Sequence, residues 1–322
     1  MMDQDKTFSL VIPTFNRAAL VCQTVATALK QTVPFFEIIV VDDGSTDDTV
    51  VRLREFGDRI KLIASEKSGV QVARNLGVQA AAGDYITFSD SDDLLLPEFV
   101  AVMSEWLSAH PDYDSVYCNY QSFCGEKIEN DILSAAPAGF LDGARRVGNF
   151  IEYIPDLYAR TVFFQPLMPT GATVKKSFYQ RIGGFNPVFN RMPSEDWEYT
   201  LRALASGKTA ICALPLVRIR HHESNDSRDL LQRELGEVEI LKYALQNHDA
   251  ARLHRLVIEE GIQRRHRKVF YESFRKRQFG VAGLVFPYLE NMPQTLPFKF
   301  KTLVMSAYLK CFKPDPDFLF RR

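Results

Sequence analysis

Residues 84–93 read DYITFSDSDD. Its first half is an apolar run typical of a buried strand, and its second half places carboxylates where that strand ends. Asp90 and Asp92 lie two residues apart, so in an extended chain they point to the same side. Two hard oxygen ligands on one side suit Mg²⁺ or Mn²⁺. The alternative is a solvated acidic turn before a helix with Pro97 at its first position.

The segments before this stretch alternate between strand and helix. Strands are expected at residues 8–12, 37–41, 61–64 and 84–89, with helices at about 18–30, 47–56 and 68–82. Asn16 can cap the first helix, and Ser45 or Thr46 the second. This order predicts an α/β fold with a largely parallel sheet. Ligands bind such sheets at the carboxyl ends of the strands, where both acidic clusters of this region fall.

The second half of the chain has a weaker pattern. Further strands are expected at residues 114–120, 171–175 and 210–219, a helix at 194–205, and helices from about 226 to 290. Residues 122–168, with scattered glycines, prolines and aromatic residues, are expected to form irregular loops with short helices.

Composition limits the class of protein. At 322 residues, with 46% hydrophobic and 25% charged residues, the chain is an ordinary globular protein. Residues 251–322 hold 15 Lys or Arg and 6 Asp or Glu, a net charge of +9, so the first 250 residues carry −10. Five cysteines without a C-x-x-C pair indicate a reducing compartment and no zinc site. Neither a secretory signal nor an apolar run of about 20 residues is recognised, which predicts a cytoplasmic protein.

Seven segments, taken in order, resemble glycosyltransferase family 2, the inverting, metal-dependent GT-A class. They are LVIPTFNR (10–17), VVDDGSTD (40–47), ARNLG (73–77), GDYITFSDSDD (83–93), GGF (183–185), Glu195-Asp196 and Arg220-x-His222. The resemblance implies a GT-A, Rossmann-like fold, with a mostly parallel central sheet flanked by helices. It also implies a catalytic domain over residues 1–228, with a nucleotide-binding half at about 1–110 and an acceptor half at about 111–228. Residues 229–322 match nothing in the family and are expected to form a basic helical extension.

The resemblance implies a site for a nucleotide sugar. Asp43 would accept the ring N–H of a uracil-like base, and Pro13 and Phe15 would line the base and ribose. Arg74, near the base or diphosphate, and Asn16 complete the expected nucleotide-binding residues. Helix capping is the alternative role for Asp43, and an exposed helix position the alternative for Arg74.

The family's D-x-D motif maps onto Asp90-Ser91-Asp92. Asp92 is expected to bind Mn²⁺ or Mg²⁺, and Asp90 to contact the ribose or a metal-bound water, with Asp93 the weaker candidate. The metal would stabilise the leaving diphosphate as a Lewis acid. His222 is expected to be a further metal or diphosphate contact, with a purely structural histidine as the alternative.

Asp196 resembles the family's general base, which takes the proton of the attacking acceptor hydroxyl. Glu195 would orient Asp196 or the acceptor, while Trp197 is expected in the core. The alternative is that both acids merely complement the dipole of the helix that starts there. One base on the face opposite the leaving group implies single displacement with inversion.

The expected partners follow from this resemblance and from the charge of the tail. They are a UDP-sugar donor and a saccharide or lipid-linked saccharide acceptor in surface polysaccharide or glycolipid biosynthesis. Basic and aromatic residues at 264–279 and 298–310 suggest an anionic membrane surface at the inner face of the cell membrane. Packing on the catalytic domain, or a homodimer, is the alternative for these segments. Nucleic acid is not expected, because no known binding motif accompanies the basic residues.

Two other functions remain open at this point. A sugar-nucleotide nucleotidyltransferase is expected to have a glycine-rich phosphate loop after the first strand, where this chain has PTFN at 13–16. A non-catalytic nucleotide-sugar-binding protein need not hold Asp92 and Asp196 together. A Rossmann dehydrogenase is excluded because no G-x-G-x-x-G follows the first strand.

Overall fold

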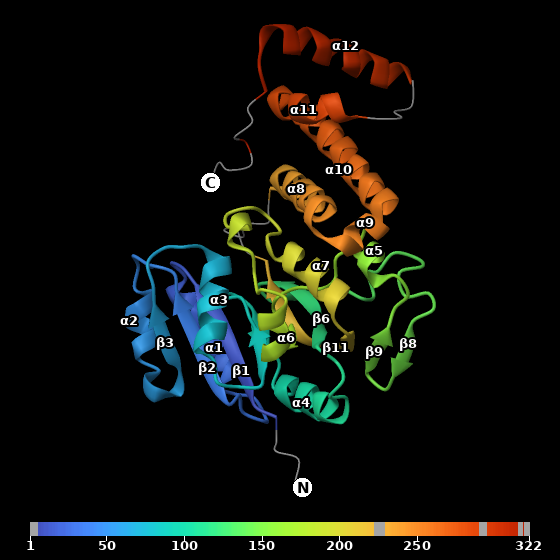
Figure 1. Cartoon of the computed structure of the whole chain (residues 1–322). Helices are drawn as coiled ribbons and strands as arrows, with labels where there is room; N and C mark the ends of the chain where they lie inside the picture. The colour runs from blue at the N-terminus through green and yellow to red at the C-terminus, as the bar shows by residue number, and fades with distance from the viewer. Residues whose placement is uncertain (1–5, 222–228, 290–294, 315–317, 319–322) are drawn as a thin grey trace. The chain divides into compact units, whose positions relative to one another are not determined.

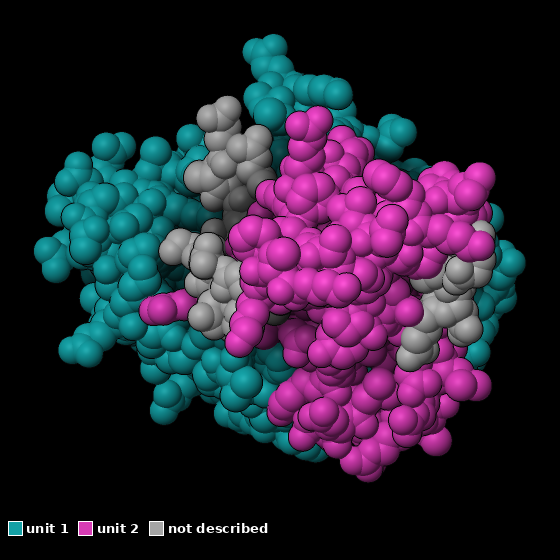
Figure 2. Space-filling view, turned by 90° about the horizontal axis from the view of Figure 1, so that it is seen from above, with its two compact units in different colours: residues 1–190, 199–222 teal, residues 191–198, 223–322 magenta. Residues whose placement is uncertain are grey.

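The computed structural model describes residues 6–221, 229–289, 295–314 and 318 of the chain (Figure 1). His222, expected to contact the metal or diphosphate, lies outside these described residues. The chain divides into two compact units, coloured separately in Figure 2. The first comprises residues 1–190 and 199–222, and the second comprises residues 191–198 and 223–322.

One sheet organises the first unit, with the strand order β3-β2-β1-β4-β10-β6-β11-β9-β8. Its strands are β1 (Phe8–Thr14), β2 (Glu37–Asp42), β3 (Lys61–Ala64), β4 (Tyr85–Phe88), β5 (Leu94–Leu95), β6 (Ser115–Cys124), β7 (Lys127–Asp131), β8 (Arg145–Val147), β9 (Phe150–Tyr153), β10 (Thr173–Lys175) and β11 (Thr209–Arg220). Strands β1 to β4 pair in parallel, as do β6 and β11, while β10 runs antiparallel between β4 and β6. The predicted α/β fold with a mostly parallel central sheet is confirmed.

Helices cover both faces of this sheet (Figure 1). They are α1 (Ala18–Ala28), α2 (Thr49–Arg54), α3 (Val70–Ala80), α4 (Phe99–Ala109), α5 (Leu157–Thr161), α6 (Lys176–Arg181) and α7 (Asp196–Ser206). Alternate residues of β1 enter different cores. Leu10 and Ile12 pack in the cluster that contains α1 and α4, whereas Val11 packs with α3 and α6. The apolar strands are therefore buried on both sides, as a parallel sheet between two helix layers requires.

Residues 122–168 are more ordered than predicted. They contribute the end of β6, all of β7, β8 and β9, and the short helix α5. A tight turn at Gly125, with φ at +58°, joins β6 to β7, and Gly148 at +55° lies between β8 and β9. The side chains of β8 are all exposed, so these short strands show no alternation of apolar and polar residues that a sequence pattern could reveal.

The second unit is helical, which confirms the predicted C-terminal helical part. Its helices are α8 (Leu230–Asn247), α9 (Asp249–Leu253), α10 (Arg255–Arg275), α11 (Phe279–Val285) and α12 (Leu296–Cys311). Leu231, Val269, Phe270 and Val285 lie in a core that α8, α10 and α11 share with α12. Across the described residues, none of the helices combines the length and apolar character needed to cross a membrane.

Candidate active site

The loops that follow β1 and β2 are joined by hydrogen bonds at the carboxyl edge of the sheet. The backbone N–H of Asn16 donates to Ser45 Oγ (2.8 Å), and Asn16 Oδ1 accepts from the backbone N–H of Thr46 (2.7 Å). Asn16 has a positive φ of 50° and does not cap α1, whose N-cap residue is Arg17. Ser45 and Thr46 do not cap α2 either, because that helix starts later, at Thr49. Both predicted caps are wrong, because these side chains bind across the two loops instead.

The other residues expected around the base lie on the same two loops. Pro13 is buried within β1 and pairs in register with Val41 of β2. Phe15 is half-buried, and the ammonium group of Lys67 lies 3.8 Å from the centre of its ring. The Phe15 ring is therefore partly exposed at this edge of the sheet, whereas Pro13 is a buried residue of strand β1.

Asp43 is held by the residues that precede α3. One of its carboxylate oxygens accepts from the backbone N–H and the hydroxyl of Ser68, at 2.7 and 3.0 Å. The other oxygen accepts from the backbone N–H of Gly69 at 2.8 Å. The side chain is buried, with 5% of the residue exposed. Asp43 does not cap the helix that follows β2. It ties β2 to the start of α3, and the oxygen that accepts only from Gly69 keeps a lone pair for a ligand N–H.

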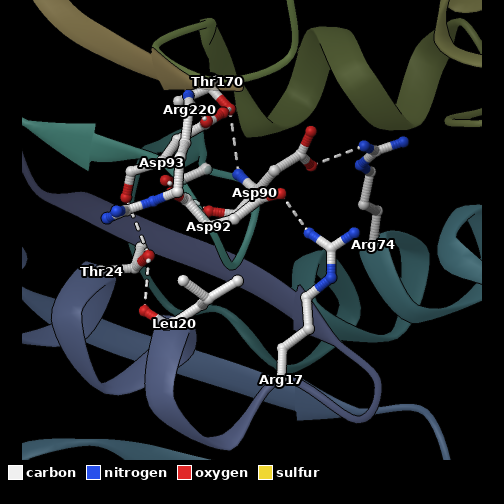
Figure 3. A network of polar contacts seen from close by, with 10 residues as sticks. Arg17, Leu20, Thr24, Arg74, Asp90, Asp92, Asp93, Thr170 and Arg220 are labelled. Atoms are coloured by element: carbon white, nitrogen blue, oxygen red, sulfur yellow. Dashed lines mark hydrogen bonds and ion pairs between the residues drawn. The ribbon is translucent and has the colours of Figure 1, made fainter. Parts of the chain in front are cut away.

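Each aspartate of the D-x-D motif pairs with an arginine (Figure 3). Arg74 on α3 donates to Asp90 Oδ1 at 2.8 Å, and Arg17 forms an ion pair with Asp92 Oδ2. The Asp90 side chain is 33% exposed, whereas that of Asp92 is only 7% exposed. Arg74 is buried, so it is not the exposed helix arginine considered from the sequence. The structure thus brings Asp90, Asp92 and Arg74 together.

Asp93 is buried, and both of its carboxylate oxygens accept hydrogen bonds within the protein (Figure 3). Its carboxylate accepts from Thr170 Oγ1 at 2.6 Å and from the backbone N–H of Arg220 at 2.9 Å. Thr170 Oγ1 also accepts from the backbone N–H of Asp90 at 3.0 Å. Burial, together with the negative charges of Asp92 and Asp90, raises the pKa of Asp93 well above its ordinary value. Asp93 therefore fixes the acidic loop against β11 and the residues before β10.

The donor set fits a metal ion that completes its coordination with phosphate oxygens. Among the residues that the structure describes, no group of three or more His, Cys, Asp or Glu side chains could enclose a metal. Asp90 and Asp92 nevertheless offer carboxylate oxygens on one loop. Mg²⁺ in phosphate-transfer sites is commonly bound by one or two carboxylates together with phosphate oxygens. Such an ion would displace the Arg17 side chain from Asp92.

Asp196, the expected general base, and Glu195, expected to orient it or the acceptor, belong to the second unit. Glu195 directly precedes α7 and Asp196 is its first residue, and the first three residues of α7 group with that unit. The next two residues are anchored there. Trp197 is 1% exposed, with the guanidinium of Arg265 5.1 Å from its ring centre, and Glu198 lies 3.1 Å from His248 Nε2. Trp197 is a core residue, as expected.

Three residues that contact the acidic loop were not predicted from the sequence as part of the site. Arg17 and Arg220 stand inside two of the quoted segments, but neither had been given a role. Arg220 donates from Nε to the backbone carbonyl of Asp92 at 2.8 Å. Thr170 carries no motif, and only the pairing of its chain segment with β4 places it beside Asp93. A surface hollow lined by Phe35, Glu37, Arg59 and Lys61, among others, opens at the other edge of the sheet, away from these carboxylates.

Comparison with known families and curated proteins finds similar sequences for the first half of the chain. Residues 9–159 match the model of the family described as Glycosyl transferase family 2. Validoxylamine A glucosyltransferase from Streptomyces hygroscopicus subsp. jinggangensis is 44% identical over 108 residues, covering 32% of this chain and 25% of that protein. The putative glycosyltransferase EpsH from Bacillus subtilis is 32% identical over 130 residues, covering 38% of this chain and 37% of that protein. Each alignment thus spans well under half of the relative's own length.

Solved structures extend the likeness beyond the family match. The crystal structure of S. aureus TarS residues 1–349 in complex with UDP-GlcNAc has a TM-score of 0.64 to this chain. It covers 87% of this chain and 79% of that one at 16% sequence identity. At this identity the likeness concerns the fold alone, which is the GT-A fold expected from the sequence.

Proposed function

Because residues 9–159 match the model of glycosyltransferase family 2, we propose that this chain belongs to that family and transfers a sugar from a nucleotide donor to an acceptor hydroxyl. The proposed donor is a UDP-sugar, and the proposed reaction is a single displacement that inverts the anomeric carbon. TarS, which shares the fold, has been crystallised with UDP-GlcNAc and with UDP, which supports a uridine nucleotide as the donor.

One observation carries the proposal. Asp43, Asp90 and Asp92 follow β2 and β4 at the carboxyl edge of the parallel sheet, inside the residues that match the family. Ligands of open α/β sheets bind at this edge. Arginines surround the acidic loop, with Arg17, Arg74 and Arg220 bonded to it. Carboxylates and guanidinium groups side by side suit a diphosphate that arrives with a divalent cation.

The proposed donor site gives these groups separate tasks. Asp43 accepts the ring N–H of uracil, and Phe15, Pro13 and Asn16 form the wall beside the base and ribose. Asp90 and Asp92 hold Mn²⁺ or Mg²⁺, which supplies positive charge to the leaving diphosphate. Arg74 keeps Asp90 in place and adds positive charge beside the diphosphate.

The proposed acceptor chemistry uses Asp196 as general base. A carboxylate in the first turn of a helix is favoured as the anion by the N-terminal end of the helix dipole, so Asp196 is suited to accept a proton. Glu195 is proposed to orient Asp196 or the acceptor. His222 remains a proposed metal or diphosphate contact.

The wider role is also a proposal. The acceptor is a saccharide or lipid-linked saccharide of surface polysaccharide or glycolipid biosynthesis. The basic C-terminal part would bring the protein, from the cytoplasm, to an anionic membrane where such acceptors are assembled.

A donor screen with matched variants tests the proposal. Purified protein is incubated with a panel of nucleotide sugars and Mn²⁺, with and without a chelator, and free nucleotide is measured. We expect metal-dependent release of UDP from one donor.

Asp43→Ala should weaken binding of UDP and of UDP-sugar alike while leaving the circular dichroism spectrum unchanged. Binding of a donor without turnover, even with candidate acceptors, would instead favour a non-catalytic binding protein. Formation of a sugar nucleotide from sugar phosphate and UTP would favour the nucleotidyltransferase.

A further inference from the structure

Helix α12 (red in Figure 1) buries one apolar face inside the second unit. Phe298 and Met305 are 6% and 0% exposed. The Phe298 ring lies 6.2 Å from that of Phe270 on α10, and the Tyr308 ring lies 6.0 Å from that of Phe279 on α11. This inner face holds α12 on the helical unit.

The opposite face of α12 is also apolar. Leu296, Phe300 and Leu303 are 83%, 64% and 69% exposed, and their spacing of four and then three residues aligns them on one side of the helix. Phe312, just after the helix, is 59% exposed. An amphipathic surface helix normally turns polar residues outward. Helix α12 instead carries large apolar side chains on both faces, and only the inner face is covered within the described residues.

Within α12 and the residues just after it, the charged side chains have one sign. Residues 296–314 contain four lysines and no acidic residue. Lys299, Lys310 and Lys313 are exposed, and the Lys301 ammonium lies 4.4 Å from the centre of the Tyr271 ring. Apolar side chains flanked by lysines, without a compensating acid, are the composition of helices that lie in the interface of an anionic membrane.

The basic segment on α10 does not offer such a surface. Arg265 is 7% exposed and donates from Nε to Glu237 at 2.7 Å, while Val269 and Phe270 are fully buried. These residues hold helices together within the second unit. The basic side chains of this segment are mostly exposed, but its aromatic residues are buried or half-buried. The segment therefore offers charge without an exposed apolar face, whereas α12 has both.

We infer that the outer face of α12, formed by Leu296, Phe300, Leu303, Phe312 and the flanking lysines, docks on an anionic lipid surface. The apolar side chains enter the boundary between head groups and acyl chains, and the lysines contact the anionic head groups. A second copy of this chain would bring the same lysines close together, and residues 296–314 hold no acid to pair with them, which disfavours a symmetric dimer through this part of the chain. This inference rests on the proposed membrane partner and not on the sugar-transfer chemistry.

Vesicle binding by the full-length protein tests the inference. Binding is measured to vesicles of phosphatidylcholine with and without phosphatidylglycerol, at low and high salt. We expect binding only with phosphatidylglycerol. The double variant Phe300→Ser/Leu303→Ser should lower the partition coefficient at least about tenfold. Each of Lys299→Gln and Lys310→Gln should lower it about fivefold.

Leu253→Ser/Leu256→Ser is the matched control, because these leucines are 85% and 82% exposed on α9 and α10. This control should bind as the wild type does.

Three results would overturn the docking surface. The first is a wild-type protein that ignores both kinds of vesicle. The second is a Phe300→Ser/Leu303→Ser variant that binds like the wild type, which would move membrane contact elsewhere. The third is a wild-type dimer by light scattering that the same variant converts to a monomer. Hydrolysis of the donor sugar in the absence of vesicles reports separately on the proposed transferase and should be the same in all these variants.

Discussion

The two units of the chain bury carboxylates in different ways. In the first unit Asp43, Asp92 and Asp93 follow strands, and their partners are backbone N–H groups, the hydroxyls of a serine and a threonine, and the Arg17 side chain. In the second unit buried or partly buried acids contact basic side chains from other helices or helix ends, in the pairs Glu198 with His248, Glu234 with Lys268 and Glu237 with Arg265. The first arrangement gathers charge at one edge of a sheet, and the second spreads it between helices.

The difference separates a binding role from a structural role. The Arg17 side chain is 26% exposed on a loop, so an incoming ligand can replace it. The Arg265 side chain is 9% exposed within α10 and lies between Glu237 and the Trp197 ring. We therefore expect substitutions in the acidic loop to change ligand binding more than stability, and substitutions in the helical pairs to do the opposite.

Asp196 is the residue that would break this division most clearly, because it belongs to the helical unit but is proposed to act in catalysis. Asp196→Asn keeps the size of the side chain and removes the base, so turnover should fall by about 10²–10⁴-fold. UDP binding, measured by calorimetry, should stay near the wild-type value. Glu195→Gln should cost less. If Glu195→Gln is inactive while Asp196→Asn is fully active, the two roles are exchanged.

Asp92→Ala should remove the metal dependence of UDP binding. Loss of a metal ligand should cost at least as much as the roughly 10–100-fold that outer-shell partners contribute to metal affinity. Calorimetric titration of UDP with Mn²⁺ or with a chelator measures this, and the thermal unfolding of the variant should stay close to that of the wild type. Equal UDP affinity with Mn²⁺ and with chelator in the wild type would rule out the metal role of Asp92.

Arg265→Met should destabilise the second unit, because it leaves Glu237 without its buried partner. A hydrogen bond to a charged group of this kind is worth about 2 kcal/mol of unfolding free energy. Arg255→Met is the matched control, since Arg255 pairs with Glu259 at 2.7 Å but both side chains are exposed. The control should lose less than about 0.5 kcal/mol. Similar losses in urea titrations of the two variants would show that burial does not set the strength of these pairs.

His266 should make the second unit sensitive to acid. Burial, with a smaller contribution from the charge of Lys242, lowers the pKa of His266 to about 4. The unfolded chain binds a proton there below about pH 6.5, whereas the folded chain does so only near pH 4. Stability from this group is therefore complete above pH 6.5 and is lost as the pH falls toward 4, by about 2 kcal/mol at pH 5. His266→Gln should remove this part of the pH dependence in denaturant titrations, and an unchanged pH profile would contradict it.

Arg17→Gln should have the smallest effect, with a characteristic sign. The guanidinium and a divalent ion compete for Asp92, so the variant should bind Mn²⁺ a few-fold more tightly in the absence of nucleotide, about 1 kcal/mol or less. Arg59→Gln, which alters an arginine at the other edge of the sheet, is the control. Weaker Mn²⁺ binding in Arg17→Gln would mean that Arg17 supports the metal site instead of competing with the metal.

The sequence predicted the first half of the fold well, because β1 and β2 are continuous apolar runs followed by polar turns. Leu10 and Val11 must both be buried, and only a sheet between two helix layers allows this. It also predicted that Asp43, Asp90 and Asp92 would follow strands. Strands such as β8 were missed because their exposed side chains carry no periodicity.

The partners within the site could not be predicted from the sequence. Asp43 is bound by Ser68 and Gly69, which lie 25 and 26 residues further along the chain, and no local pattern joins them. Asp93 receives Thr170 in the same way, across 77 residues. Asn16 was expected as a helix cap from its residue type, but its side-chain oxygen accepts a hydrogen bond from Thr46 in the loop after β2 instead. Such choices depend on which loops meet at the sheet edge, and residue propensities do not contain that information.

Gly77 links the packing of the first unit to its chemistry in a way that a genetic screen would detect. A Cβ atom at this position would overlap Val11 of β1, so any other residue must push α3 away from the sheet. The same helix carries Arg74 one turn earlier and follows directly on the residues that bind Asp43. Loss-of-function and temperature-sensitive alleles should therefore include changes at Gly77, although this residue has no side chain to touch a substrate. Partial suppressors should shorten Val11.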